Sequence, residues 1–525
     1  MLARSSHKLA KVGLALGGAT GLYAGYRLAY SEEGDFDIYN IGVARFGRAA
    51  FTVGSIGLDY KKSLFGPQVD LESADYEQIK SHCHQRSADK LLKLCCDNGG
   101  CFIKVGQHIG ALDYLLPEEY VSTLKILHHK APAMAMHDVM AVLREDLKTD
   151  PAQVFVEFDE EPLGTASLAQ VHRARLKDGS EVAVKVQHRY VKNHSFVDIT
   201  TMDILIRTVK LVFPDFEFMW LAEEMKKNLP LELSFTEEGK NAEKISILLE
   251  KFSWLKIPEI HWDLTSDRVI VMEYCPGGHV NDLEYIKANK IDPLDISKKI
   301  GQMYAEMIFR YGYVHCDPHP GNVLVQKDDN GNPQVVLLDH GLYTQLTHDF
   351  RKNYADFWLS ILNADLDGIK QNADKLGVGQ LYGLFACMVS GRSWSSIQKG
   401  IGTNEKSSAE SKEIKENAQM YIKQIADVLA FVNRQMILLF KTNDLLRGIE
   451  HSLGTQNSMA SFIQMSRACF RCLSAEERRR SRTRWGRFQV SLCSQWHQLK
   501  ITFYQVFLWA WWSSLGRKVR ALTSS

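Results

Sequence analysis

The stretch Val314 to Leu342 decides the fold, and its two ends read VHCDPHPGNVLV and VVLLDHGL. The first end places Asp317 in a loop-forming sequence, with Asn322 five positions later. The second end is an apolar run, Val335 to Leu338, which predicts a strand that leads directly into Asp339. We therefore expect two acids and one amide to stand at the ends of neighbouring backbone segments.

These three side chains suit phosphoryl transfer, in which one Asp accepts the proton of the attacking hydroxyl or positions the nucleophile. An Asn and a second Asp then hold Mg²⁺ on the phosphates of ATP or ADP. The sequence thus predicts Asp317 as a catalytic residue, and Asn322 and Asp339 as metal ligands. The alternative is that both acids are helix caps or turn residues.

A second motif is the segment EVAVKV, Glu181 to Val186, which alternates apolar and polar residues and predicts a strand with Lys185 on one face. The turn before it, PLGTASLAQVH, completes the order of a phosphate loop and a lysine that bridges the α and β phosphates. Kinases place repeated glycines in this loop, so that backbone N–H groups approach phosphate closely. Here the methyl groups of the loop alanines should keep the loop away from the phosphate or change its conformation. The predicted nucleotide-binding residues of the loop are Gly164, Ala166 and Ser167.

Acidic residues on a helix should follow, since the strand lysine needs a partner there. The segment NLPLELSFTEEGKNAEKI provides Glu232, Glu237 and Glu238. Next, IVMEYCPGG predicts an apolar strand that ends in a hinge. Backbone groups around Glu273 and Cys275 would meet the edge of the adenine ring.

The sequence after Asp339 lacks a feature of protein kinases. Protein kinases close the activation segment with Ala-Pro-Glu, but the last proline of this chain is Pro333. Helical periodicity follows instead, over Phe350–Leu376 and Asn417–Leu453. We conclude that the usual platform for a peptide substrate is missing or rebuilt.

Composition limits the remaining function classes. The chain has 525 residues and a net charge of +1, so no global charge favours nucleic acid, and we expect no nucleic-acid partner. Ten cysteines are too few for a disulfide framework in a chain of this length. The cysteines and histidines between His82 and Cys101 lack the spacing of a zinc site, and buried helical thiols explain them better.

Both ends of the chain point to a membrane. Residues 1–31 are basic and serine-bearing, with no acid before the end of the segment, which is typical of a mitochondrial transit peptide. Glycines at every fourth position from Gly13 to Gly25 leave open a retained membrane helix. At the other end, an arginine cluster from Arg478 to Arg487 precedes ITFYQVFLWAWW, Ile501 to Trp512. Such sequence suits a membrane interface, and the alternative is a helix packed on the domain surface.

Taken together, KVGQ at residues 104–107, the alanine-bearing loop, VAVKVQ, LELSF, HCDPHPGN and LLDHG resemble the UbiB-type (aarF-domain) atypical kinases. The resemblance covers roughly Gly99 to Tyr343. It implies an α+β, protein-kinase-like bilobal fold with a helix-rich C-lobe. It also implies an N-terminal helical extension over the active site, whose regulatory residues would be Lys104, Gly106, Gln107 and Glu232.

The resemblance assigns two further roles. Glu238 would be the partner of Lys185, and Glu232 would begin the family motif acid-x-Asp, in which this chain has Ser234 at the second acid. That departure bears on how the extension is fastened. The family is associated with mitochondria or plastids, with quinone and lipid biology, and with nucleotide binding and slow ATP hydrolysis.

We therefore expect a targeting segment (1–31), a helical extension (32–150), an N-lobe (151–275), a C-lobe (276–460) and a basic, aromatic tail (461–525). The expected function is ATP hydrolysis, or phosphotransfer to a lipid-related or small-molecule acceptor, with ATP or ADP and Mg²⁺. The expected place is the mitochondrion, at the inner membrane, with membrane lipids and mitochondrial proteins as partners. The alternatives are a nucleotide-sensing pseudokinase that acts as a scaffold, and a conventional protein kinase.

Overall fold

The computed structural model describes residues 42–64, 74–110, 116–128, 133–213, 219–317, 319–400, 428, 434–455 and 460–512. The chain divides into two compact units. Unit 1 contains residues up to Phe235 and His261–Val271, and unit 2 contains Thr236–Ile260 and the residues from Met272 onward. The targeting segment predicted for residues 1–31 lies outside the described residues. The domain boundaries expected from the sequence stay predictions.

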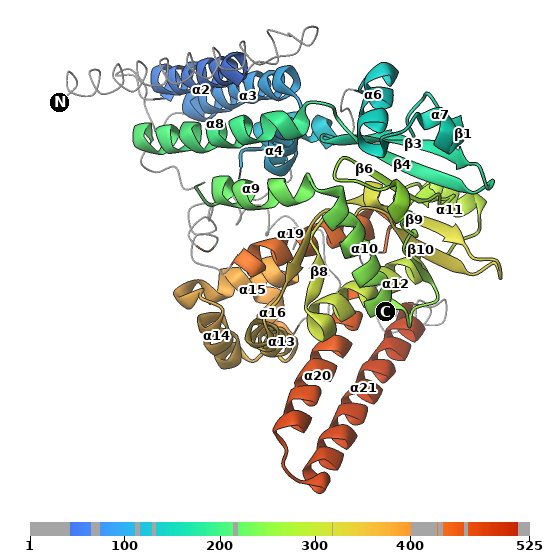
Figure 1. The fold of residues 1–525 in the computed structure, drawn as a ribbon. Coiled ribbons are helices and arrows are strands. Elements are labelled where there is room, and N and C mark those ends of the chain that lie inside the picture. Colours follow the sequence, from blue (N-terminus) through green and yellow to red (C-terminus); the bar gives the residue numbers. More distant parts are fainter. Residues whose placement is uncertain are drawn as a thin grey trace. The chain divides into compact units, whose positions relative to one another are not determined.

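Three long helices form one side of unit 1 (Figure 1): α2 (Gly42–Leu64) packs against α3 (Ala74–Asn98) and α8 (Val191–Val212). A buried ion pair ties α2 to α8, because Arg45 Nε donates to Asp198 Oδ1 at 2.8 Å. Burial raises the pKa of Asp198, and the Arg45 guanidinium opposes that shift. The pair therefore stabilises the helices only while both members are present.

A two-glycine break divides the helical residues 74–110. Gly99 and Gly100 have φ of 64° and 50°, a left-handed conformation that favours glycine, and they separate α3 from α4 (Cys101–Gly110). The KVGQ segment therefore lies on a short helix of its own. Helix α5 (Glu118–Leu124) and the 3₁₀ turn η2 (Lys125–His128) pack against it.

The sheet of unit 1 has the order β1-β3-β4-β6, with β2 paired to β3. Val182, Val184 and Val186 are fully buried beneath helix α6, and strand alternation puts Lys185 on the opposite face. The elements are α6 (Met136–Leu147), α7 (Pro151–Val154), β1 (Phe155–Phe158), β2 (Gly164–Thr165), β3 (Ala169–Leu176), β4 (Glu181–Gln187), α9 (Met219–Glu232) and β6 (Val269–Glu273).

Unit 2 contains a sheet of order β5-β10-β9-β7 and a small ladder of β8 with β11. Helix α12 passes into a π-helical turn, Glu306–Tyr311, which Gly312 ends with a φ of 66°. The elements are α10 (Phe235–Leu249), β5 (Leu255–Lys256), η3 (Trp262–Leu264, part of unit 1), β7 (Gly278–His279), α11 (Leu283–Ala288), α12 (Pro293–Ala305), β8 (Tyr313–His315), η5 (Pro320–Asn322), β9 (Val323–Lys327), β10 (Pro333–Leu337) and β11 (Tyr343–Gln345).

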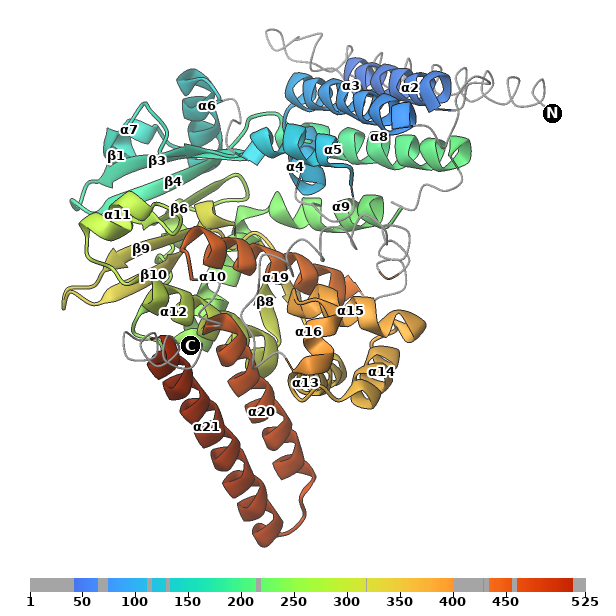
Figure 2. The same ribbon diagram turned by 180° about the vertical axis from the view of Figure 1, so that it is seen from behind.

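The rest of unit 2 is helical. Thr347 caps α13 by accepting a hydrogen bond from the Phe350 N–H. The last two helices, α20 and α21, run side by side in both views (Figures 1 and 2). Among the described residues, we find no helix with the length and apolarity needed to span a bilayer. The helices are α13 (His348–Leu362), α14 (Leu366–Lys375), η6 (Gly379–Leu381), α15 (Tyr382–Ser390), α16 (Trp394–Lys399), α19 (Arg434–Ser452), α20 (Ala460–Arg480) and α21 (Arg484–Trp512).

Candidate active site

The loop that follows β8 carries the first predicted acid. Asp317 lies two residues beyond the strand, and the turn η5 then leads to Asn322 at the start of β9. The Asn322 side chain reaches back along the loop, where its Nδ2 donates to the Asp317 carbonyl oxygen at 3.1 Å. The five-residue spacing in the sequence is therefore the span of one closed loop.

The second predicted acid is brought to the same place by strand pairing. Strands β9 and β10 are antiparallel, with Leu337 opposite Val323. One residue further, the Leu338 N–H donates to the Asn322 carbonyl at 2.9 Å. Asp339 is the next residue after this contact with Asn322. Its Oδ1 accepts a hydrogen bond from the Gly341 N–H at 2.9 Å.

These residues fit a magnesium ion by the chemistry of their donor atoms. Mg²⁺ prefers oxygen ligands and is usually held by one or two protein oxygens with nucleotide phosphates. The Asn322 side-chain Nδ2 is used within the loop, so the side-chain oxygen Oδ1 is the atom it offers to a metal. Asp339 supplies a carboxylate from the segment after β10, which is joined to Asn322 through the Leu338 N–H. Asn322 and Asp339 are accordingly the residues that would hold the ion.

Lys441 is a residue of the site that the sequence motifs did not reveal. Its Nζ lies 2.9 Å from Asp317 Oδ1. Helix α19, which carries Lys441, is held against the loop because Leu438 packs with Cys316 and Leu342. A cation therefore touches the predicted catalytic carboxylate from a helix more than a hundred residues away in the chain, and no local pattern could have indicated it.

Buried rings of unit 2 support the loop. His340, between Asp339 and Gly341, pairs its Nδ1 with the Tyr343 hydroxyl at 2.9 Å and its Nε2 with the Leu337 carbonyl at 3.1 Å. His315 is fully buried beside Tyr343, and burial lowers the pKa of its imidazole. The loop thus lies against a layer of packed rings that includes the buried His315 and His340.

Glu238, the predicted partner of Lys185, lies on α10 with 3% of its surface exposed. Its Oε1 accepts a long hydrogen bond, 3.4 Å, from the His340 N–H. The acid is therefore beside the Asp339 segment within unit 2. Lys185 belongs to unit 1, so its pairing with Glu238 stays a prediction.

The predicted adenine hinge follows β6. The Glu273 N–H already donates to the Glu259 carbonyl at 2.8 Å, and the Glu273 carboxylate pairs with Lys256. What Glu273 can offer to adenine is therefore its carbonyl oxygen. Cys275 is buried with Leu324 and Val336, and burial raises the pKa of its thiol to about 11. Cys275 is therefore an uncharged thiol within an apolar wall.

In unit 1, Lys185 projects from β4 with its Nζ 5.1 Å from the centre of the Phe235 ring. A cation over an aromatic face gains about 0.5–2 kcal/mol, more where water is excluded. This contact places the ammonium group over the first residue of α10, which still belongs to unit 1.

The alanine-bearing loop is held in a closed turn. Gly164 of β2 is paired with Val171 of β3, and the Ala166 N–H donates to the Ala169 carbonyl at 2.8 Å. His188 fastens the turn from the end of β4, with its Nε2 3.0 Å from the Ala166 carbonyl and its N–H donating to the Leu168 carbonyl. Burial lowers the pKa of His188, so it serves as a neutral donor to Ala166. This residue too was absent from the predicted set.

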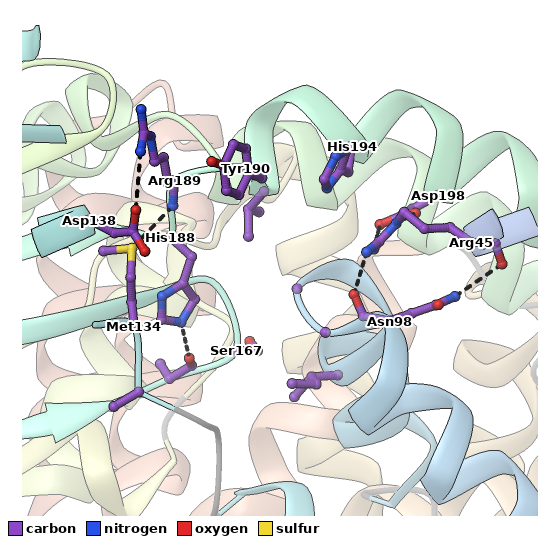
Figure 3. Close-up of a pocket in the computed structure, with 16 residues that line it drawn as sticks. Arg45, Asn98, Met134, Asp138, Ser167, His188, Arg189, Tyr190, His194 and Asp198 are labelled. Carbon is purple, nitrogen blue, oxygen red and sulfur yellow. Dashed lines mark hydrogen bonds and ion pairs between the residues drawn. The ribbon is translucent and has the colours of Figure 1, made fainter. Parts of the chain in front are cut away.

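Ala166 and the buried Ser167 line a cavity of about 230 Å³ inside unit 1 (Figure 3). Across it stands the ion pair of Arg45 with Asp198. The two glycines of the break after α3 also line the cavity. One side of the loop is therefore taken up by the helical part of unit 1. The labelled lining residues are Arg45, Asn98, Met134, Asp138, Ser167, His188, Arg189, Tyr190, His194 and Asp198.

The KVGQ segment is fastened within unit 1 by each of its predicted residues. Lys104 Nζ lies 2.6 Å from Glu232 Oε2, and both side chains are largely buried. Gln107 Nε2 donates to the Leu127 carbonyl at 2.9 Å. A Cβ on Gly106 would stand 2.4 Å from Leu127 Cδ1, so glycine is what lets η2 pack against α4. The placement of α4 over the active site stays a prediction.

The departure at Ser234 is compensated in space. Ser234 Oγ donates to Asp267 Oδ1 at 3.2 Å, and the Phe235 N–H donates to the Asp267 carbonyl. A carboxylate from the turn before β6 thus stands beside the position where the family motif has its second acid. Because Asp267 is far from Ser234 in the sequence, the local acid-x-Asp motif does not include it.

Comparisons with known proteins give the class first: residues 126–373 match the ABC1 atypical kinase-like domain. The AarF domain-containing protein kinase 1 of Xenopus tropicalis is 50% identical over 93% of this chain and 93% of its own length. The AarF domain-containing kinase 1 of Drosophila melanogaster is 48% identical over 90% and 92%. The solved complex of Rv3197 with erythromycin from Mycobacterium tuberculosis aligns over 74% of this chain and 99% of that one, with 18% identity and a TM-score of 0.46. The chain belongs to the ABC1 (AarF-domain) atypical kinase family, and its α+β, kinase-like fold is confirmed.

Proposed function

We propose that the chain binds ATP with Mg²⁺ and catalyses its hydrolysis, or the transfer of its γ-phosphoryl group to a non-peptide acceptor. The observation that carries this proposal is the meeting of Asp317, Asn322 and Asp339 at one end of the β9–β10 hairpin. Such convergence of an acid with two oxygen ligands has a direct use in phosphoryl transfer.

Each residue has a distinct task in this reaction. Asp317 accepts the proton of the attacking hydroxyl or water, and Lys441 keeps its carboxylate in place. Lys185 binds the α and β phosphates. Asn322 and Asp339 would hold Mg²⁺, and the bound ion would neutralise charge on the phosphates. The Glu273 carbonyl and the wall around Cys275 receive the adenine, which orients the γ-phosphate toward Asp317.

The acceptor in this proposal is not a peptide. No proline follows Pro333, so the Ala-Pro-Glu closure that supports peptide binding is missing from the sequence. The ion pair of Lys104 with Glu232 supports a fixed, rather than transient, α4. The Lys104 ammonium and the Glu232 carboxylate are both largely buried, and breaking such a pair costs about 3–5 kcal/mol.

We assign the acceptor to lipid-related or small-molecule chemistry, in membrane and lipid homeostasis at the mitochondrial inner membrane. The basic, acid-free segment 1–31 and the tryptophan-rich sequence near the other end of the chain support this part. Membrane lipids and mitochondrial proteins are accordingly the proposed partners.

The proposal is tested by ATP hydrolysis with purified protein, Mg²⁺ and lipid vesicles, comparing wild type with Asp339→Asn. We expect the variant to lose at least about 100-fold in rate, since it removes a metal ligand. Thermal shift with ATP or ADP, with and without Mg²⁺, should show metal-dependent stabilisation only for the wild type. Equal hydrolysis by the two proteins would refute the assignment.

The rival function is a nucleotide-sensing scaffold, favoured by the closed alanine-bearing turn, whose Ala166 carbonyl is already bonded to His188. Complementation of cells that lack the protein separates the two. If Lys185→Met, Asp317→Asn and Asp339→Asn all restore function, the scaffold is correct and catalysis is dispensable.

A further inference from the structure

Helix α21 exposes its large apolar side chains, whereas a surface helix usually buries them. Six large apolar residues are between 52% and 77% exposed, at positions three or four apart: Trp485, Phe488, Leu492, Trp496, Leu499 and Phe503. At 100° per residue they fall within an arc of about 80°, so they form one straight stripe along the helix. We call this set the apolar stripe.

The opposite side of α21, which faces α20, is mostly polar. Gln498 Nε2 donates to the Arg467 carbonyl at 3.1 Å, and Arg467 also donates to Thr502. His497 stacks on Phe470 with ring centroids 4.6 Å apart. A helix that packs through its polar side and turns its aromatic side outward is expected where the outer medium is itself apolar.

Charge identifies that medium. After Glu477 the sequence contains no Asp or Glu, whereas it contains ten Lys and Arg. Arg484 and Lys500 lie on the two flanks of the apolar stripe, roughly 80° from its centre. Lys500 extends along its neighbour, with Nζ 5.7 Å from the centre of the Trp496 ring. Long cationic side chains beside an apolar face are placed to reach anionic headgroups while the stripe enters the acyl region.

We propose that α21 lies in the surface of an anionic bilayer, with the apolar stripe inserted at the headgroup boundary and the flanking residues Arg484 and Lys500 in contact with lipid phosphates. From Trp485 to Phe503 the stripe is about 27 Å long, which suits a helix lying in the interface. A second copy of this chain is a poor occupant, since two α21 helices would bring cations together without an acid between them. The proposal specifies the membrane partner of the proposed function.

The test is flotation of the full chain with vesicles of phosphatidylcholine alone or mixed with phosphatidylglycerol, in the absence of nucleotide. We expect binding to the anionic vesicles and blue-shifted tryptophan emission. The variant Trp485→Ser/Phe488→Ser/Trp496→Ser should bind roughly tenfold more weakly or worse, because three anchors are lost. The matched control, Gln489→Ser/Gln495→Ser, changes exposed residues beside the stripe and should bind as wild type.

The charge component is tested separately with Arg484→Gln/Lys500→Gln, which should reduce the preference for anionic vesicles and the sensitivity to salt. The proposal is overturned if the stripe variant binds as well as wild type. It is equally overturned if wild type ignores vesicles and the stripe variant instead breaks a dimer or releases an acidic protein partner. Asp339→Asn should float as wild type, so a failure here is distinct from a failure of the proposed catalysis.

Discussion

At the scale of single residues, the site depends on side chains that differ in how visible they are in the sequence. Asp317 and Asn322 belong to one loop, so their spacing can be read directly from the sequence. Lys441 touches Asp317 from another part of the chain, and only packing of Leu438 against Cys316 brings it there. A motif search finds the first kind of residue and misses the second.

Lys441→Met should lower the turnover of ATP roughly tenfold or more, with little change in nucleotide affinity. The reason is that Lys441 orients the Asp317 carboxylate at 2.9 Å and does not belong to the predicted nucleotide contacts. Steady-state hydrolysis gives the turnover, and nucleotide thermal shift gives the affinity. Lys352→Met, which removes a partner of Asp356 on α13, is the control and should leave turnover unchanged. A rise in turnover for Lys441→Met would show that this lysine restrains Asp317 instead.

At the scale of elements, α4 shows how a short motif depends on close packing. Lys104, Gly106 and Gln107 each make a different kind of contact: an ion pair to α9, a Cβ-free approach to η2, and a hydrogen bond to the Leu127 carbonyl. The resemblance identified these residues together, although composition and periodicity alone describe an amphipathic helix with some polar positions. The break at Gly99 and Gly100 frees this helix from α3 and lets it take its own direction.

Gly106→Ala should lower the free energy of unfolding by about 1–3 kcal/mol, because the added methyl meets Leu127 Cδ1 at 2.4 Å and Cys95 Sγ at 3.0 Å. Thermal or urea denaturation measures the change. Gly54→Ala on α2 is the control, since a Cβ added there would have no neighbouring atom within 4 Å. That variant should be neutral or stabilising by up to about 1 kcal/mol, as alanine favours a helix over glycine. Equal effects of the two changes would contradict the packing explanation.

At the scale of the whole molecule, each unit holds a histidine with a lowered pKa beside a predicted functional loop. Burial lowers the pKa of His188 at the alanine-bearing turn and of His315 beneath the Asp317 loop. In the unfolded chain both regain a pKa near 6.5, so unfolding takes up protons below that pH. Above about pH 6.5 these two histidines do not lower the free energy of unfolding. Below that pH, the free energy of unfolding falls as the pH drops toward the pKa of the folded state.

Lowering the pH from about 7.5 to 5.5 should reduce the melting temperature of the wild type, with each histidine contributing up to about 1.4 kcal/mol per pH unit below 6.5. His188→Gln keeps an amide donor for the Ala166 carbonyl but removes the titration, so its loss of stability over this range should be smaller. Differential scanning calorimetry at both pH values makes the comparison. A larger acid-induced loss in the variant would contradict the sign of this effect.

The sequence by itself determined the kinase-like class, the strand that carries Lys185 and the loop residues Asp317 and Asn322. It could do so because these features depend on spacing along a few neighbouring residues, where turns and strand alternation have a fixed period. The hairpin then added Asp339 through ladder pairing that the apolar run already indicated.

Only the tertiary structure decided the contacts between distant segments. It placed Lys441 on Asp317, Asp267 beside Ser234, and His188 on the alanine-bearing turn. It also decided which side of α21 faces outward, since helical periodicity gives the stripe but not the direction in which it points. These choices follow from the packing of the whole chain, in which burial and pairing are settled between residues that the sequence keeps far apart.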